Sequence, residues 1–398
     1  MRCSVVNLGC KVNRVESDGF VGTLARMGFA PCAHGGAHVV VVNTCTVTAV
    51  AEKKTRKAVR QALAANPGAL VIVTGCASAQ SPSVYTQMSD RVEVVPKWDM
   101  EARLEKLRLP GGPSAAAPCE AASFLAPGRA RVGVKVQDGC ANACTYCIVH
   151  QVRGPETSTD PAQVVRRARE AAALGAGEVV LAGINLGRYD FDGLGLDGLL
   201  ARLLDAGLDC RIRLSSVEPD NLDAATVERI AAAEGRICRH LHLPLQSGSS
   251  KVLREMGRRY AAEDFLALVR SLRERMPSVS VSTDVIAGFP GETDADFEET
   301  MALCRECGFS KMHVFPYSER EGTPAAARGD QVPREARILR AEALRSLGDE
   351  LRRADAASRR GTVEAAVVED ERWCTTESYH AVRTPAGARP GQLVDVAL

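Results

Sequence analysis

The sequence lacks an uninterrupted apolar run of 18 residues, which is the length a helix needs to cross a bilayer. Its first residues, MRCSVVNLGC, lack the basic start and apolar stretch of a secretory signal. Neither sign of charge dominates, because Lys and Arg number 50 and Asp and Glu 49. This balance neither requires nor excludes a nucleic-acid partner, since a basic patch can be local. We therefore predict a cytoplasmic protein with no membrane partner.

Cysteine, by contrast, is abundant, with 14 among 398 residues. A cytoplasmic chain keeps its thiols reduced, so this number indicates metal or redox chemistry rather than disulfides. Hydrophobic residues make up 45% of the chain, which is enough for sizeable cores and excludes a mainly disordered protein. The length allows about two to three domains.

Three cysteines lie within eight residues, Cys140, Cys144 and Cys147, at the spacing C-x3-C-x2-C. Thiolates are the natural ligands of iron in iron–sulfur clusters. Three of them hold three irons of a cubane cluster and leave the fourth open to a small molecule. The alternative is a small zinc site, but zinc prefers paired C-x2-C or Cys/His knuckles with four ligands. No fourth Cys or His follows at knuckle spacing, although His150 is close.

A second set of cysteines is spread over the first 110 residues, where strand and helix patterns alternate. Three short apolar stretches are predicted to be buried parallel strands: 4–8, 38–43 and 70–74. The alternation predicts a doubly wound α/β sheet. Cys10, Cys45 and Cys76 each follow one of these strands closely, so they are expected to meet at one edge of the sheet. We predict a second three-thiolate cluster site there, and ordinary buried cysteines are the alternative.

The middle of the chain repeats strand and helix patterns six times. The strand candidates are 132–137, 178–182, 211–215, 240–244, 279–286 and 311–315. In a parallel barrel the site lies at the carboxyl ends of the strands. Polar or glycine-containing loops follow the predicted strand ends, at 183–187, 215–219, 243–249 and 284–292. Their joint occurrence argues against ordinary turns.

These motifs resemble known proteins. The C-x3-C-x2-C spacing resembles the signature of the radical S-adenosylmethionine (SAM) enzymes, and the run 284–292, DVIAGFPGE, is similar to their DxIxGFPGET. GCKVN at 9–13, VNTCTV at 42–47 and GC at 75–76 look like the amino-terminal domain of the methylthiotransferases. The chain is similar to this family over nearly its whole length, 1–398.

The resemblance implies an α/β fold with three parts: an N-terminal doubly wound α/β domain, a partial (βα)6 radical SAM barrel and a small C-terminal β-barrel of the TRAM type. The implied domains are 1–110, a linker at 111–128 that contains Cys119, the radical SAM core at 129–330, a connecting helix at 331–360 and the TRAM-like domain at 361–398. In the family the TRAM domain binds tRNA. The arginines of the connecting helix leave two roles open, a solvated helix and a contact with RNA phosphates.

The resemblance also implies SAM and two [4Fe-4S] clusters, an auxiliary one on Cys10, Cys45 and Cys76 and a radical SAM one on the later triplet. The residues implied to contact SAM are Tyr146, Gly183, Asn185, Ser215, Glu218, Gln246, Asp284 and Gly288. No side chain is singled out as a general base. Cys304 and Cys307 lie on a predicted helix, and we interpret them as buried structural thiols.

The family has three branches, which act on isopentenyl-adenosine in tRNA, on threonylcarbamoyl-adenosine in tRNA and on an aspartate of a ribosomal protein. GCKVN resembles the second branch. The implied reaction replaces C2–H of N6-threonylcarbamoyladenosine at position 37, next to the anticodon, by a methylthio group, with one SAM supplying the methyl and another initiating the radical step. The implied partners are tRNA, a reductant such as flavodoxin or ferredoxin, and a sulfur source. The sister substrates and a non-enzymatic iron–sulfur cluster carrier are the alternatives.

Overall fold

The computed structural model describes residues 1–33, 35–46, 49–107 and 129–398. It divides into two compact units, Met1–Pro127 with Ile148–Gly154, and Gly128–Cys147 with Pro155–Leu398. The predicted linker at 111–128, with Cys119, lies outside the described residues. None of the helices in the described ranges is both long and apolar enough to span a membrane.

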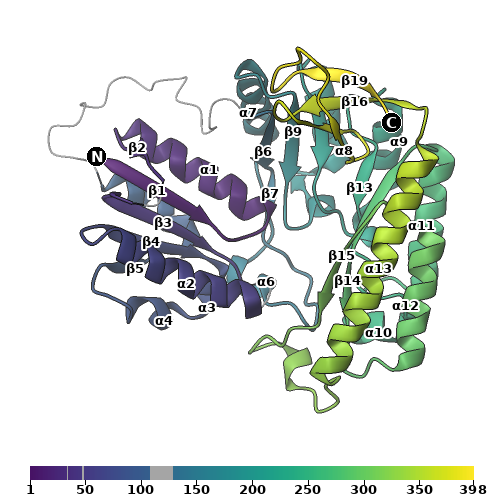
Figure 1. Cartoon of the computed structure of the whole chain (residues 1–398), viewed down its shortest axis with the longest axis horizontal. Coiled ribbons are helices and arrows are strands. Elements are labelled where there is room, and N and C mark those ends of the chain that lie inside the picture. Colours follow the sequence, from purple (N-terminus) through teal and green to yellow (C-terminus); the bar gives the residue numbers. More distant parts are fainter. Residues whose placement is uncertain (34, 47–48, 108–128) are drawn as a thin grey trace. The chain divides into compact units, whose positions relative to one another are not determined.

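The first unit is a five-stranded parallel sheet with the order β2-β1-β3-β4-β5 (Figure 1). Its strands are β1 (Arg2–Asn7), β2 (Ala30–Pro31), β3 (Val39–Thr44), β4 (Leu70–Gly75) and β5 (Val92–Val94). The connecting helices are α1 (Lys11–Arg26), α2 (Ala49–Ala65), α3 (Cys76–Gln80), α4 (Pro82–Thr86) and α5 (Met100–Glu105). Both faces of β3 are buried, because Val40 and Val42 pack in one apolar cluster and Val39 and Val41 in another. The predicted α/β sheet is confirmed.

The second unit contains six parallel strands in two ladders, β6-β9-β12 and β13-β14-β15. They are β6 (Arg131–Lys135), β9 (Glu178–Ala182), β12 (Arg211–Leu214), β13 (His240–His242), β14 (Ser280–Ala287) and β15 (Lys311–Pro316). Two parallel bridges, Ile212 to Ile237 and Ser216 to His242, connect the ladders at β12 and β13. All six strands were expected from the sequence, and the bridged ladders run in the order β6-β9-β12-β13-β14-β15, while their closure into a partial barrel stays a prediction.

Helices separate these strands along the chain. They are α7 (Pro161–Ala173), α8 (Leu196–Asp205), α9 (Ala224–Ala232), α10 (Ser250–Glu255), α11 (Ala262–Arg275) and α12 (Asp294–Cys307). A capping box starts α12, since Thr293 and Asp296 each accept a hydrogen bond from the other's backbone N–H. Cys304 and Cys307 are fully buried on this helix, and burial raises the pKa of Cys307 to about 12. Such thiols fit the interpretation of a structural role.

The C-terminal part adds the long helix α13 (Arg334–Ser358) and a four-stranded antiparallel sheet with the order β18-β17-β16-β19. The strands are β16 (Val363–Val368), β17 (Trp373–Thr376), β18 (Ala381–Arg383) and β19 (Leu393–Ala397). Helix α13 packs along β14 and β15 (Figure 1). Arg337 and Arg340 on it pair with Glu319 and Glu292 of the same unit. Closure of the sheet into a TRAM-like barrel stays a prediction.

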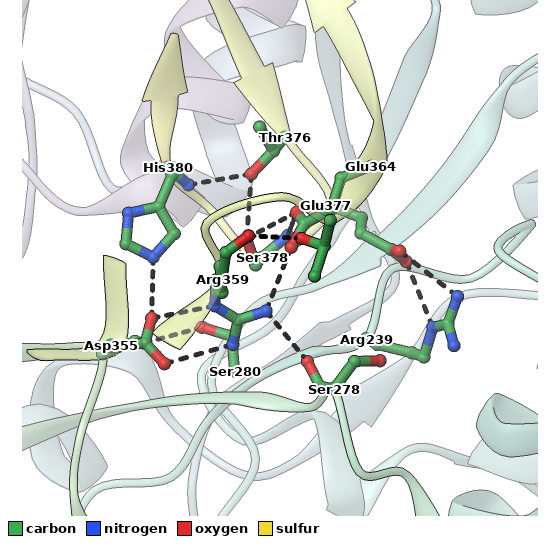
Figure 2. A network of polar contacts seen from close by, with 12 residues as sticks. Arg239, Ser278, Ser280, Asp355, Arg359, Glu364, Thr376, Glu377, Ser378 and His380 are labelled. Carbon is green, nitrogen blue, oxygen red and sulfur yellow. Dashed lines mark hydrogen bonds and ion pairs between the residues drawn. The ribbon is translucent and has the colours of Figure 1, made fainter. Parts of the chain in front are cut away.

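The C-terminal sheet is fixed to the rest of its unit by buried polar contacts. Figure 2 shows Arg359 donating to the Glu364 carboxylate and to the Ser278 carbonyl, both at about 3 Å. His380 lies 2.7 Å from Asp355, and Arg359 donates to the same carboxylate. The sheet is therefore part of one compact unit with the six parallel strands.

Candidate functional site

The first cysteine triplet lies in the loop that follows β6 and the short strand β7 (Gln137–Asp138). Thr145 fixes this loop, because its hydroxyl donates to the Glu255 carbonyl at 2.8 Å and its backbone N–H donates to the Met256 carbonyl at 3.0 Å. Cys144 is buried, whereas Cys140 and Cys147 are partly exposed. The loop thus holds one thiol inside and two at its surface.

The thiols of this triplet influence one another. Burial raises the pKa of the Cys140 thiol, and the Cys144 thiol raises it further. Tyr146 is partly buried, and this burial raises the pKa of its hydroxyl, to which the Cys144 and Cys147 thiols add. Several thiolates gathered without a cation are therefore unfavourable, and iron ions at this place would relieve the repulsion.

Arg258 is the cation of this site, and the sequence did not single it out. Its guanidinium lies 3.5 Å from the Cys144 sulfur and binds the Glu218 carboxylate. Only 3% of the Arg258 side chain is exposed. Burial raises the pKa of Glu218, and Arg258 opposes that rise. One predicted SAM contact and one predicted cluster ligand thus share a buried partner.

Four of the predicted SAM contacts are joined by hydrogen bonds. The Gly183 backbone N–H donates to the Ser215 hydroxyl at 3.2 Å, and the Glu218 N–H lies 3.4 Å from the Asn185 side-chain oxygen. Gln137, which the sequence analysis missed, accepts from the backbone of Ile184 and Asn185 at 2.9 and 3.0 Å. These bonds hold the ends of β9 and β12 together.

A Cβ at Gly183 would lie 3.0 Å from the Gln137 side-chain oxygen. Glycine therefore lets this loop approach Gln137 closely.

The remaining predicted contacts, Gln246, Asp284 and Gly288, lie on or near β14. Gln246 has a left-handed backbone (φ 69°), and its N–H donates to the Asp284 carbonyl at 2.9 Å. At Gly288 (φ 75°) a Cβ would come within 2.5 Å of Arg337 on α13, so a protein contact accounts for this glycine. The Asp284 side chain lies 3.3 Å from His242.

The second set of cysteines lies in the first unit, where its members follow the neighbouring strands β1, β3 and β4. Cys45 and Cys76 are each 6% exposed, while Cys10 is exposed. Burial raises the pKa of Cys76 to about 11, and the thiols of Cys10 and Cys45 contribute to this rise. The structure therefore brings the three thiols together at the carboxyl ends of the strands, as the sequence predicted.

A buried amide network supports this set. Asn13 and Asn43 exchange hydrogen bonds of 2.9 Å, and the Cys10 thiol donates to the Asn13 side-chain oxygen at 3.2 Å. At Gly75 (φ 96°) a Cβ would lie 2.5 Å from the Thr44 carbonyl, so only glycine fits before Cys76. The GCKVN and NTC motifs thus shape the cysteine loops.

Arg153 is the cation of the second set. It belongs to the same unit, on helix α6 (Val149–Arg153), and is 5% exposed. It donates to the Asn13 side-chain oxygen at 2.9 Å and pairs with Glu16 at 3.2 Å. Its charge lowers the pKa of Cys76 against the effect of burial. The sequence analysis noted no role for this arginine.

A single zinc ion needs its thiolate ligands close together. Zinc–sulfur bonds of about 2.3 Å place the thiolates of one zinc ion about 3.8 Å apart. Within the described ranges, one set of three possible metal ligands has all its ligand atoms within 4.8 Å of one another, and its members are His242, Asp284 and His313. This set contains no cysteine. Among the described residues, neither cysteine triad is as compact as one zinc ion held by three thiolates requires.

Comparisons with known proteins identify the family of this chain. The family model described as "Radical SAM superfamily" matches residues 134–304, and the model described as "Uncharacterized protein family UPF0004" matches residues 2–96. The chain is 37% identical to the threonylcarbamoyladenosine tRNA methylthiotransferase MtaB of Bacillus subtilis strain 168, over 86% of this chain and 79% of that protein.

The chain belongs to the radical SAM methylthiotransferase family. It is most like relatives of the threonylcarbamoyladenosine branch. It is also 33% identical to a tRNA-2-methylthio-N(6)-dimethylallyladenosine synthase of Geobacillus thermodenitrificans strain NG80-2, over 91% of this chain and 73% of that protein. Membership of a radical SAM family implies one [4Fe-4S] cluster and SAM.

The fold is shared with more distant proteins. The chain superposes on the radical SAM methyltransferase TsrM from Kitasatospora setae with a TM-score of 0.56 at 17% identity, over 81% of this chain and 74% of that chain. This likeness concerns the fold alone. Methylthiotransferase sequence and radical SAM architecture are thus found in the same chain.

Proposed function

We propose that this methylthiotransferase acts on tRNA and replaces C2–H of N6-threonylcarbamoyladenosine at position 37 by a methylthio group. The product is 2-methylthio-N6-threonylcarbamoyladenosine. The observation that carries the proposal is the pair of three-thiol sites, each with one buried arginine against its cysteines. The name of the relative from Bacillus subtilis supports the substrate.

The second candidate substrate is N6-dimethylallyladenosine, which is the isopentenyl-adenosine named above, because the relative from Geobacillus is named for it.

Cys140, Cys144 and Cys147 would hold the radical SAM cluster, with its fourth iron left for SAM. When bound, cluster and SAM supply a carbon radical, which can act at C2 of an adenine where acid–base groups cannot. Arg258 would balance thiolate charge at Cys144 and hold Glu218 in place. Gln137 would position the loop after β9. The proposed SAM contacts are Tyr146, Gly183, Asn185, Ser215, Glu218, Gln246 and Gly288.

Cys10, Cys45 and Cys76 would hold the auxiliary cluster, which would supply a place for the sulfur to be transferred. Arg153 would favour the Cys76 thiolate against the effect of burial, which raises the pKa of this thiol to about 11. Both clusters need electrons and the reaction needs a sulfur atom, so we propose a reductant such as flavodoxin or ferredoxin and a separate sulfur source as partners.

Helix α2 offers a surface for the tRNA. Lys53, Lys54, Lys57 and Arg60 are exposed on it. Across the part of the chain that the structure describes, none of these four forms an ion pair. Unpaired cations along one helix are suited to phosphate groups, whose binding releases counterions. We also propose that the sheet at 361–398 is TRAM-like and contributes to tRNA binding.

The test is mass spectrometry of tRNA nucleosides from a strain that lacks the gene. We expect the methylthio group to disappear from threonylcarbamoyladenosine and to return with the wild-type chain but not with Cys144→Ala or Cys45→Ala. Cys32→Ser, outside both triads, is the matched control and should restore it fully. Loss confined to methylthio-isopentenyl-adenosine would assign the sister substrate. An unchanged nucleoside profile would contradict a tRNA substrate.

A further inference from the structure

Three metal-binding side chains lie on adjacent strands of the second unit, away from both cysteine triads in sequence. His242 ends β13, Asp284 lies in β14 and His313 lies in β15. One ligand atom from each lies within 4.8 Å of the others. Among the described residues, no other set of three His, Cys, Asp or Glu side chains is this compact. Neither histidine takes part in the proposed tRNA reaction.

The strand register explains why these side chains converge. Asp284 and His313 are direct partners in the parallel ladder between β14 and β15, and His242 is the partner of Ser282 on the other side. Residues 282 and 284 are two apart, so their side chains share one face of β14. The three ligands therefore project from rigid, hydrogen-bonded strands, which hold a site more accurately than loops do.

The spacing suits a single ion. Histidine nitrogens and carboxylate oxygens bind zinc at about 2.0–2.2 Å, so two ligands of one ion are at most about 4.4 Å apart. His242 Nε2 and Asp284 Oδ1 are 3.3 Å apart, and the rings of His242 and His313 have centroids 5.7 Å apart. Small side-chain rotations would bring all three atoms to bonding distance.

Ser282 orients the buried histidine. Its hydroxyl lies 3.0 Å from Nδ1 of His242 and 3.0 Å from Nε2 of His240. Metal-binding histidines usually donate their second ring N–H to an oxygen in this way, which fixes the tautomer. In the tautomer in which Nδ1–H donates to Ser282, the Nε2 lone pair of His242 faces the Asp284 carboxylate at 3.3 Å, and a cation between the two acceptors would stabilise them. In the other tautomer Nε2–H donates to Asp284 and no ion is needed.

We propose that His242, Asp284 and His313 bind one divalent first-row transition-metal ion, such as Zn²⁺ or Fe²⁺. Two histidines and one carboxylate are a ligand set that zinc and non-haem iron both accept. His242 is 7% exposed, whereas His313 is exposed, so the site is reachable from solvent. Three protein ligands leave at least one coordination position for water or another small ligand.

The proposal assigns Asp284 to the ion in place of the SAM contact predicted for it. It does not rest on the proposed tRNA reaction, because ion binding is measured without substrate. The competing explanation is an ordinary ion pair between protonated His242 and Asp284, in which His313 has no part. His313 therefore distinguishes the two explanations.

The test uses the holoprotein with its iron–sulfur clusters loaded under anaerobic conditions. The protein is dialysed against buffered Zn²⁺, and zinc and iron per chain are measured by plasma mass spectrometry. We expect one zinc per chain more in the wild type than in His313→Ala or His242→Ala, with unchanged iron. Ser282→Ala keeps the three ligands, and we expect it to weaken zinc binding about 10- to 100-fold. His38→Gln, an exposed histidine of the first unit, is the matched control.

X-ray absorption at the zinc edge provides a second measurement that needs no variant. We expect nitrogen and oxygen neighbours at about 2.0–2.2 Å and no sulfur shell. A sulfur-dominated spectrum would show that zinc has bound to cysteines and would overturn the proposal. Equal zinc in the wild type and His313→Ala, or an equal loss in His38→Gln, would overturn it as well and leave the ion pair as the explanation.

Discussion

The buried carboxylate of Glu178 is where we expect a single substitution to have its largest effect on stability. Glu178 is 0% exposed and accepts from Arg131, Arg211 and Arg213 at 2.7–2.9 Å. Arg211 and Arg213 in turn donate to backbone carbonyls of the C-terminal sheet, at Thr375 and at 376–377. The carboxylate thus neutralises the cations that hold this sheet to the parallel strands.

Glu178→Gln keeps the shape and removes the charge, which takes the shared counter-ion from Arg211 and Arg213, while Arg131 keeps its pair with Glu369. Breaking a buried pair by neutralising one partner typically costs about 3–5 kcal/mol. Each kcal/mol lowers Tm by about 2–4 °C in large domains, so we expect a fall of at least about 6 °C. The amide keeps one accepting oxygen, but its NH2 replaces an oxygen that accepts two arginine N–H groups, so hydrogen bonds are lost together with the charge.

The effect should depend on pH in a defined direction. Burial alone would raise the pKa of Glu178, but Arg213, Arg131 and Arg211 hold it well below its usual value. A depressed carboxyl pKa contributes stability above the pKa of the unfolded chain, about 4.3, and loses it as the pH falls through the folded pKa. The difference between the wild type and Glu178→Gln should therefore be full at pH 7 and shrink below about pH 4.5.

The assay is the fluorescence of Trp373 on β17, in a Trp98→Phe background that leaves it the sole tryptophan of the chain. Glu369→Gln is the control, because Glu369 pairs with the same Arg131 at 3.1 Å but its side chain is 41% exposed. We expect it to cost less than about 1 kcal/mol. An equal shift of the unfolding midpoint in both variants would refute the reasoning.

Three further predictions concern the candidate sites. Arg258→Met removes the cation beside Cys144 and Glu218, and we expect the rate of reductive SAM cleavage to fall at least about tenfold. The control Arg259→Met should leave this rate unchanged. A loss of equal size in both variants would contradict the role of Arg258. Arg153→Met should raise the pKa of Cys76 further and reduce iron bound by the auxiliary triad, measured by electron paramagnetic resonance, while the radical SAM signal stays. The double variant Lys53→Glu, Lys57→Glu should weaken tRNA binding and reduce the slope of log affinity against log salt concentration by the equivalent of about two phosphate contacts. The control Arg166→Glu on α7 should change neither the affinity nor the slope.

Much of the fold follows from local patterns in the sequence. The strands β3 and β4 are continuous apolar runs that end in polar or glycine residues, and the six parallel strands of the second unit are separated by amphipathic helices. Short elements escaped prediction, because β2 has 2 residues and β5 has 3, too few to show a period. For the same reason the four-residue strand β17, WCTT, was missed in the C-terminal sheet.

The cysteines could be predicted and their supporting residues could not. A triplet in one loop is visible in the sequence, and the second set was found from strand ends, which a parallel sheet brings to one edge. Arg258 is 114 positions from Cys144, and Arg153 is 140 positions from Asn13. The neighbouring residues do not distinguish either arginine, because an exposed arginine on a loop or short helix would have the same sequence around it as these buried ones.

The two thiol sites solve one electrostatic problem in the same way. Three thiolates in a partly buried place repel one another and are poorly solvated, which the raised pKa values of Cys140 and Cys76 reflect. Each site has one arginine with almost no exposed surface, tied to a carboxylate that fixes its position: Arg258 to Glu218, and Arg153 to Glu16. A guanidinium stays charged at any working pH, so it favours the thiolate without itself titrating. Each site thus has a fixed positive charge in place before iron binds. We therefore expect loss of either arginine to reduce the iron retained at its site as much as loss of the more exposed cysteines, Cys10, Cys140 and Cys147, does.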